Sequence, residues 1–259
     1  MRNGHLVRMA MVVLAAAGLA RSSSGGADLP HQAYVWQRLW TPALRQAVAQ
    51  SAELVEGWRV LAAQSNGRGR LVPVAVDWAA LAASGRPVTA VVRIEGQLAR
   101  LDSDALRADI AALLAGLAEK RVALAGLEID HDCATGRLAA YADFLERLRP
   151  STPGLALSIT ALPAWLSSPL LDRALAAADG AVLQVHAVEA PQRGLFDPAR
   201  AEEWVRAFGR RTKKPFRVAL PAYGVRVGYG ETGSLASVEG ERPLLARRRR
   251  PRGADREPG

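Results

Sequence analysis

The feature that most constrains the fold is a series of short, almost continuously apolar stretches along the chain. Because strands of this kind are buried on both faces, they are typical of a parallel sheet covered by helices. We predict strands at residues 33–38, 71–78, 88–95, 122–132, 155–163, 181–188 and 216–224. Helical spacing and end signals predict helices at residues 42–52, 103–120, 135–149, 170–178 and 198–211.

Seven strands are one fewer than a closed (β/α)8 barrel needs, although 259 residues are enough for such a barrel as one domain. The segment after Gly224 is rich in glycine and then in arginine, and it predicts neither strand nor helix. Residues 58–64 are open to interpretation as a further short strand or as the end of a connection. The predicted fold is therefore α/β, a TIM-like (β/α)8 barrel that is cut short after the seventh strand.

The N-terminus has the features of a secretory signal peptide. Arg2, His5 and Arg8 precede an apolar run at residues 9–20 that is too short to cross a bilayer comfortably. Arg21 stands where a lipoprotein would need cysteine, so we expect export to the periplasm or the extracellular space without a stable membrane anchor. The predicted organisation is a signal peptide (1–20), a flexible mature N-terminus (21–30), a barrel domain (31–230) and a disordered Arg-rich tail (231–259).

The net charge of +9 does not indicate a nucleic-acid partner. Residues 242–259 contain seven arginines against Asp255 and Glu257, so this tail supplies more than half of the excess. The remaining chain has no basic stripe and no nucleic-acid motif. The single cysteine, Cys133, excludes an intramolecular disulfide. The oligomeric state is left open by the sequence.

The central predicted strand ends in three acidic residues at alternate positions, Glu128, Asp130 and Asp132. Since a strand has a side-chain period of two, the three carboxylates share one face. Neighbouring like charges and burial raise carboxyl pKa values. This arrangement supplies adjacent carboxyl groups in different protonation states, as acid–base chemistry requires. The alternative interpretation is a solvated, acidic strand end without a catalytic role.

Polar and aromatic residues also stand near the carboxyl ends of the other predicted strands, where barrel enzymes have their active sites. Packing alone does not readily explain so many of them, although a single buried histidine or tryptophan is often a core residue. The candidate substrate-binding residues are Trp36, Arg38, Asp77, Trp78, Glu95, Thr160, Gln184, His186 and Tyr223. We expect no metal ligands and no cofactor.

Five blocks of the sequence resemble, in the same order, the bacterial family named domain of unknown function 3142. They read YVWQR at 34–38, GLEIDHDC at 126–133, LSITALPAW at 157–165, QVH at 184–186 and ALPAYG at 219–224. The resemblance extends over about residues 33–224. It implies a TIM-barrel fold, and the name of the family states no activity.

The central block is also similar, more distantly, to the fourth-strand signature of chitinase-type glycoside hydrolases, Asp-Gly-hydrophobic-Asp-hydrophobic-Asp-x-Glu. On that pattern Glu128 and Asp130 match the two inner aspartates, and Asp132 matches the catalytic glutamate. Ala125 replaces the leading aspartate, and Asp132 is one methylene shorter than glutamate. The eighth strand, which carries a substrate-stacking tryptophan in that family, is missing from the predicted barrel.

The resemblance implies a glycoside hydrolase-like protein that cleaves glycosidic bonds of a polysaccharide or oligosaccharide by acid catalysis, and the predicted signal peptide implies that it is secreted. Asp132 would be the general acid, Asp130 would orient it and stabilise the developing positive charge, and Glu128 would give deeper electrostatic support. Two alternatives are open: a non-catalytic carbohydrate-binding barrel, and a metal-dependent hydrolase that uses Asp130, Asp132 and His186.

Overall fold

The computed structural model describes residues 11–16, 29–98, 100–186, 194–229 and 235–243. Its strands are β1 (Met11–Ala16), β2 (His31–Val35), β3 (Gly57–Ser65), β4 (Leu71–Pro73), β5 (Val88–Ile94), β6 (Gly126–His131), β7 (Ala156–Ala161), β8 (Gly180–Gln184), β9 (Phe216–Leu220), β10 (Tyr223–Tyr229) and β11 (Leu235–Pro243). Its α-helices are α1 (Pro42–Ser51), α2 (Trp78–Ala83), α3 (Ser103–Glu119), α4 (Leu138–Leu148), α5 (Leu170–Ala176) and α6 (Pro198–Arg211).

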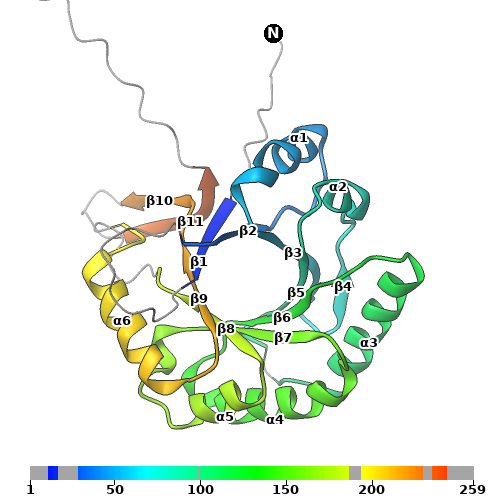
Figure 1. The fold of residues 1–259 in the computed structure, drawn as a ribbon. Helices are drawn as coiled ribbons and strands as arrows, with labels where there is room; N and C mark the ends of the chain where they lie inside the picture. The colour runs from blue at the N-terminus through cyan, green and yellow to red at the C-terminus, as the bar shows by residue number, and fades with distance from the viewer. Residues whose placement is uncertain (1–10, 17–28, 99, 187–193, 230–234, 244–259) are drawn as a thin grey trace, which may run out of the picture.

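Seven of the described strands run parallel in the order β2-β3-β5-β6-β7-β8-β9. They curl into an incomplete barrel with the helices around its outside (Figure 1). This confirms the predicted α/β class and the parallel sheet of seven strands. Local signals set the helix starts: for α3, the Asp102 carboxylate accepts a hydrogen bond from the backbone N–H of Ala105 at 3.1 Å.

The second barrel strand is β3, so the prediction of a barrel strand at residues 71–78 is wrong. Of those residues only Leu71–Pro73 form a strand, which pairs antiparallel with β3 at the barrel's outside. Asp77 caps α2, which begins at Trp78. The prediction failed because residues 71–78 are mostly apolar, and a short edge strand followed by the start of a helix can have the same composition as a buried strand.

The position between β9 and β2, left unfilled in the predicted barrel, is occupied by β1. This strand pairs antiparallel with both neighbours, with Ala15 opposite His31 of β2 and Val218 of β9. The predicted signal peptide includes β1, and the rest of residues 1–20 lies outside the described residues. The signal peptide therefore stays a prediction.

The segment after Gly224 does contain strands, contrary to expectation. β10 and β11 form a separate antiparallel pair, so assigning residues 235–243 to a disordered tail is wrong. Cross-strand backbone bonds can form in such a pair in spite of the glycine and arginine content, which lowers only local strand propensity. Residues 244–259 lie outside the described part of the chain.

Apolar side chains pack on both faces of the sheet. Leu127 and Ile129 of β6 point outward and belong to a core with Tyr141 and Phe144 of α4, all fully buried. A smaller cluster inside the barrel contains Tyr34, Val91, Val182 and Ala219. Every second residue of each strand therefore faces the barrel interior, where a polar side chain must find a partner.

No helix within the described ranges has both the length and the apolar character that a membrane span requires.

Candidate functional site

The three acidic residues lie in and just after β6, and two of them are buried inside the barrel. Glu128 and Asp130 are 0% and 1% exposed, whereas the side chain of Asp132 is 33% exposed. His131, between them, faces outward and contacts the backbone oxygen of Ile94 at 3.1 Å. The predicted alternation of the two faces is therefore present in the strand. Exposure differs along this face: the carboxylates of Glu128 and Asp130 within the strand are inaccessible, and that of Asp132, beyond its end, is accessible.

Glu128 is the centre of a complete hydrogen-bond network deep in the barrel. Its carboxylate accepts hydrogen bonds from the hydroxyls of Tyr34 at 2.5 Å and Thr160 at 2.9 Å, and it forms an ion pair with Arg59. Arg59 also donates to Gln32 and Ser158. Because these partners occupy its oxygens, Glu128 is suited to holding strands together and not to meeting a substrate.

Asp130 and Asp132 are joined through one guanidinium group, that of Arg93 on β5. Arg93 Nη1 lies 2.7 Å from Asp130 Oδ2, and Nη2 lies 3.4 Å from Asp132 Oδ2. The register explains the meeting, since Arg93 stands opposite Asp130 on adjacent parallel strands. The Oδ1 atoms of both aspartates are buried and accept no hydrogen bond from the described residues. Two acceptors are thus available for a proton or a donor.

Burial raises the pKa of Asp130 to about 7, and the negative charge of Asp132 beside it acts in the same direction. The guanidinium of Arg93 opposes this shift without cancelling it. Asp130 is therefore partly protonated near neutral pH. A pair of adjacent carboxyl groups with unequal environments can divide the acid and base roles between them.

Aromatic and imidazole groups border this pair. The guanidinium of Arg93 lies over the Trp36 ring, 5.7 Å from its centroid, and Trp36 stacks on Tyr34 with centroids 5.3 Å apart. His186 follows β8, and burial lowers its pKa while the charge of Asp132 raises it. Trp36, His186 and the two aspartates therefore belong to one end of the barrel, as predicted.

A second polar cluster connects β2, β3 and β5 at the same end. Arg38 donates a hydrogen bond to Gln64 Oε1, and Gln64 Nε2 donates to Glu95 Oε1 at 2.9 Å. The backbone N–H of Glu95 donates to the Ser65 hydroxyl at 2.8 Å. Arg38 and Glu95, predicted from separate strands, are thus brought together through Gln64, which the sequence pattern did not single out.

Asp77 and Trp78 are placed differently from the other predicted residues. The N–H of Ala80 and the guanidinium of Arg45 lower the pKa of Asp77, which caps helix α2. Trp78 packs against the core between sheet and helices. The structure does not bring these two residues to the acidic pair, because the predicted barrel strand at residues 71–78, which would have ended beside that pair, does not form.

Gln184 and Tyr223 complete the predicted set. Gln184 ends β8 on the same face as Val182, which points into the barrel, and it is partly buried. Tyr223 is the first residue of β10, and its side chain lies outside the described part of the structure.

Two positioning residues were not predicted from the sequence. Arg59 lies on β3. The sequence feature that could have indicated it is a single arginine within an otherwise mostly apolar stretch. Gly96 follows β5: a Cβ atom there would lie 2.0 Å from the backbone oxygen of Asp132. Only glycine allows this approach, so Gly96 helps to place Asp132. No local sequence pattern signals such a contact, because it joins two loops that are distant in the chain.

Within the described part of the chain, no group of three or more histidine, cysteine or acidic side chains is placed to hold a metal ion. Asp130, Asp132 and His186 therefore do not form a ligand set of that kind.

Comparison with known proteins gives one matching family and several solved structures of similar fold. Residues 84–257 match the family described as domain of unknown function DUF3142. The spore cortex-lytic enzyme SleL of Bacillus megaterium QM B1551 is similar over 80% of this chain and 54% of its own, with a TM-score of 0.63 and 14% identity. SleL of Bacillus cereus has the same coverage and identity, with a TM-score of 0.62.

A chitinase from Chromobacterium violaceum ATCC 12472 is similar over 77% of this chain and 79% of its own, with a TM-score of 0.53 and 14% identity. This chain spans about half the length of the two SleL structures. Comparison with curated protein sequences gives no match. At these identities the structural similarity establishes the fold alone, a barrel shared with SleL and with this chitinase.

Proposed function

We propose that this chain, which belongs to the family described as domain of unknown function DUF3142, is a secreted glycoside hydrolase that cleaves a polysaccharide. The observation that carries the proposal is the pair Asp130 and Asp132 at the carboxyl end of β6, bridged by Arg93. The similarity of the fold to SleL and to a chitinase supports the choice of a polysaccharide as substrate class.

Asp132 is the general acid in this proposal. Its side chain is one-third exposed, so it can reach a glycosidic oxygen above the barrel. Proton transfer from a positioned carboxyl group to the leaving oxygen is the rate-enhancing step in this class of reaction. The backbone contact with Gly96 holds the residue in place.

Asp130 orients the acid and responds to its charge. With a pKa near 7 it can hold the proton of the pair and pass it to Asp132, which donates it to the leaving oxygen; the ionised Asp130 then faces the positive charge that develops on the sugar. Arg93 keeps the two carboxyl groups at a fixed separation through ion pairs to both. Trp36, Gln184, His186 and Tyr223 are proposed to contact the sugar from the surrounding strands and loops.

The test measures the release of reducing ends from chitin and a panel of other polysaccharides by the full chain. We expect Asp132→Asn to lower kcat by about 100-fold or more, the usual contribution of a positioned general acid. The control is Asp104→Asn, which removes an 80% exposed carboxylate at the start of α3 and should leave kcat unchanged.

Two other results would overturn the proposal. Retention of a polysaccharide by both the parent and Asp132→Asn, without turnover by either, would identify a carbohydrate-binding barrel. Activity that is lost with a chelator and restored by a divalent ion would identify a metal-dependent hydrolase.

A further inference from the structure

A cavity opens at the amino-terminal end of the barrel, opposite the end that carries Asp130 and Asp132. The cavity of about 310 Å³ is bordered by the first residues of successive strands, among them Gly126 of β6, Gly180 of β8 and Phe216 of β9. A Cβ atom at Gly126 would lie 2.9 Å from the backbone oxygen of Ala156, which favours glycine there, and one at Gly180 would lie 3.0 Å from that of Pro215, a tight contact. The carboxylate network of Glu128 lies deeper in the barrel, between this cavity and Asp130.

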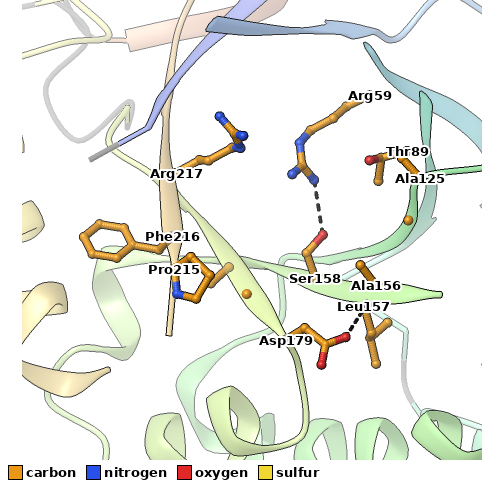
Figure 2. A pocket seen from close by; sticks show the side chains of 13 residues that line it. Arg59, Thr89, Ala125, Ala156, Leu157, Ser158, Asp179, Pro215, Phe216 and Arg217 are labelled. Atoms are coloured by element: carbon orange, nitrogen blue, oxygen red, sulfur yellow. Dashed lines mark hydrogen bonds between the residues drawn. The ribbon is translucent and has the colours of Figure 1, made fainter. Parts of the chain in front are cut away.

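Two guanidinium groups enter this cavity from different strands. Arg59 comes from β3 and Arg217 from β9, and Figure 2 shows both side chains reaching into the space enclosed by the strands. Hydroxyl groups of Ser158 and Thr89 line the same wall, and Arg59 Nη1 donates to Ser158 at 3.2 Å. The lining therefore combines positive charge with neutral hydroxyl groups.

The positive charge is only partly compensated. Arg59 is paired with Glu128, which also accepts two hydroxyl hydrogen bonds. Asp179, the acidic residue that lines the cavity, is paired with Arg149 at 2.7 Å and accepts the N–H of Leu157. The remaining charge is that of Arg217, whose Nη1 atom is buried and donates to no atom of the described residues.

The Arg217 side chain is half-buried, and its buried Nη1 donor is costly to leave without an acceptor. Burial lowers the pKa of Arg217, the charge of Arg59 lowers it further, and Glu56 acts in the opposite direction. An anion between the two guanidinium groups would supply the missing acceptor and separate the two like charges. Guanidinium groups match the planar or tetrahedral oxygen arrays of carboxylates and phosphates.

We propose that this amino-terminal cavity binds a small oxyanion, of phosphate or carboxylate type, between the guanidinium groups of Arg217 and Arg59. The site is separate from the acidic pair at the other end of the barrel. It does not depend on the proposed hydrolase activity. The cavity volume lies at the lower end of the range for small-molecule sites, which suits a ligand no larger than a phosphorylated or carboxylated monosaccharide.

Calorimetric titration of the full chain with inorganic phosphate tests the site, with sodium acetate as the carboxylate arm and sodium chloride at equal ionic strength as the blank. We expect saturable binding of phosphate or acetate, and the stronger arm distinguishes the two ligand types. Arg217→Gln should weaken that binding about tenfold or more, as expected when one charge-assisted hydrogen bond is lost.

The control is Arg206→Gln, which removes an exposed arginine of α6 that pairs with Glu202. It changes the net charge equally and should leave binding unaltered. Arg217→Lys keeps the charge without the planar fork, and an intermediate affinity is expected even if Arg217→Gln fails to fold. Equal binding by the parent and the folded Arg217 variants, or no binding of either anion beyond the chloride blank, would overturn the proposal.

Discussion

Replacement of Asp130 by asparagine tests the electrostatics of the candidate site without any substrate. Burial and the charge of Asp132 raise the pKa of Asp130 from 3.8 to about 7 in the folded chain. Between those two values the folded state binds a proton that the unfolded state has released. The free energy of unfolding therefore falls as pH rises through this window. Above the folded-state pKa, the whole contribution of this proton to stability is lost.

The magnitude follows from the size of the shift. One pKa unit corresponds to 1.36 kcal/mol, so a rise from 3.8 to about 7 corresponds to about 4 kcal/mol across the full window. From pH 4.5 to pH 8 the parent should lose about 3 kcal/mol more stability than Asp130→Asn, whose amide does not titrate. Subtracting the variant removes the contributions of the other titrating groups that the two chains share.

Urea unfolding of the full chain, followed by circular dichroism at pH 4.5, 6 and 8, measures this difference. Asp104→Asn is the matched control, since it makes the same chemical change at an exposed carboxylate of α3. A difference between the parent and Asp130→Asn that stays constant within about 1 kcal/mol over this range would refute the reasoning. It would mean that Arg93 holds Asp130 ionised in the fold, as an ordinary ion pair would.

Three further predictions concern the residues that position the site. Arg59→Met should destabilise the chain by about 3–5 kcal/mol in urea unfolding, because it leaves the Glu128 carboxylate buried without its cation; the double variant with Glu128→Gln should recover part of the loss, and an additive double variant would contradict this. Gly96→Ala should cost about 1–3 kcal/mol and reduce polysaccharide cleavage, since its methyl group meets the Asp132 backbone, whereas Gly116→Ala in α3, with open space around it, should leave both unharmed. Removal of residues 1–20 takes β1 from between β2 and β9, so the midpoint of thermal unfolding should fall, and an unchanged midpoint would show that β1 contributes nothing to the barrel.

The sequence by itself determined the class of fold and the core of the candidate site. Buried parallel strands are recognisable because both of their faces are apolar, and the period of two in β6 is enough to place Glu128 and Asp130 on one face. The match to DUF3142 over residues 84–257 confirms the family resemblance, and the seven parallel strands confirm the barrel. These features are local, so they can be read from consecutive residues.

Only the tertiary structure decided which residues meet across strands. The hydrogen-bond donors to Glu128 are Tyr34, Arg59 and Thr160, which are 94, 69 and 32 positions away in the sequence. The choice of β3 over residues 71–78 as the second barrel strand also depends on pairing, since both segments are apolar. Packing of strands and loops brings Arg93 to both aspartates and Gly96 to Asp132, and no local pattern encodes such contacts because their geometry exists only after the chain has folded.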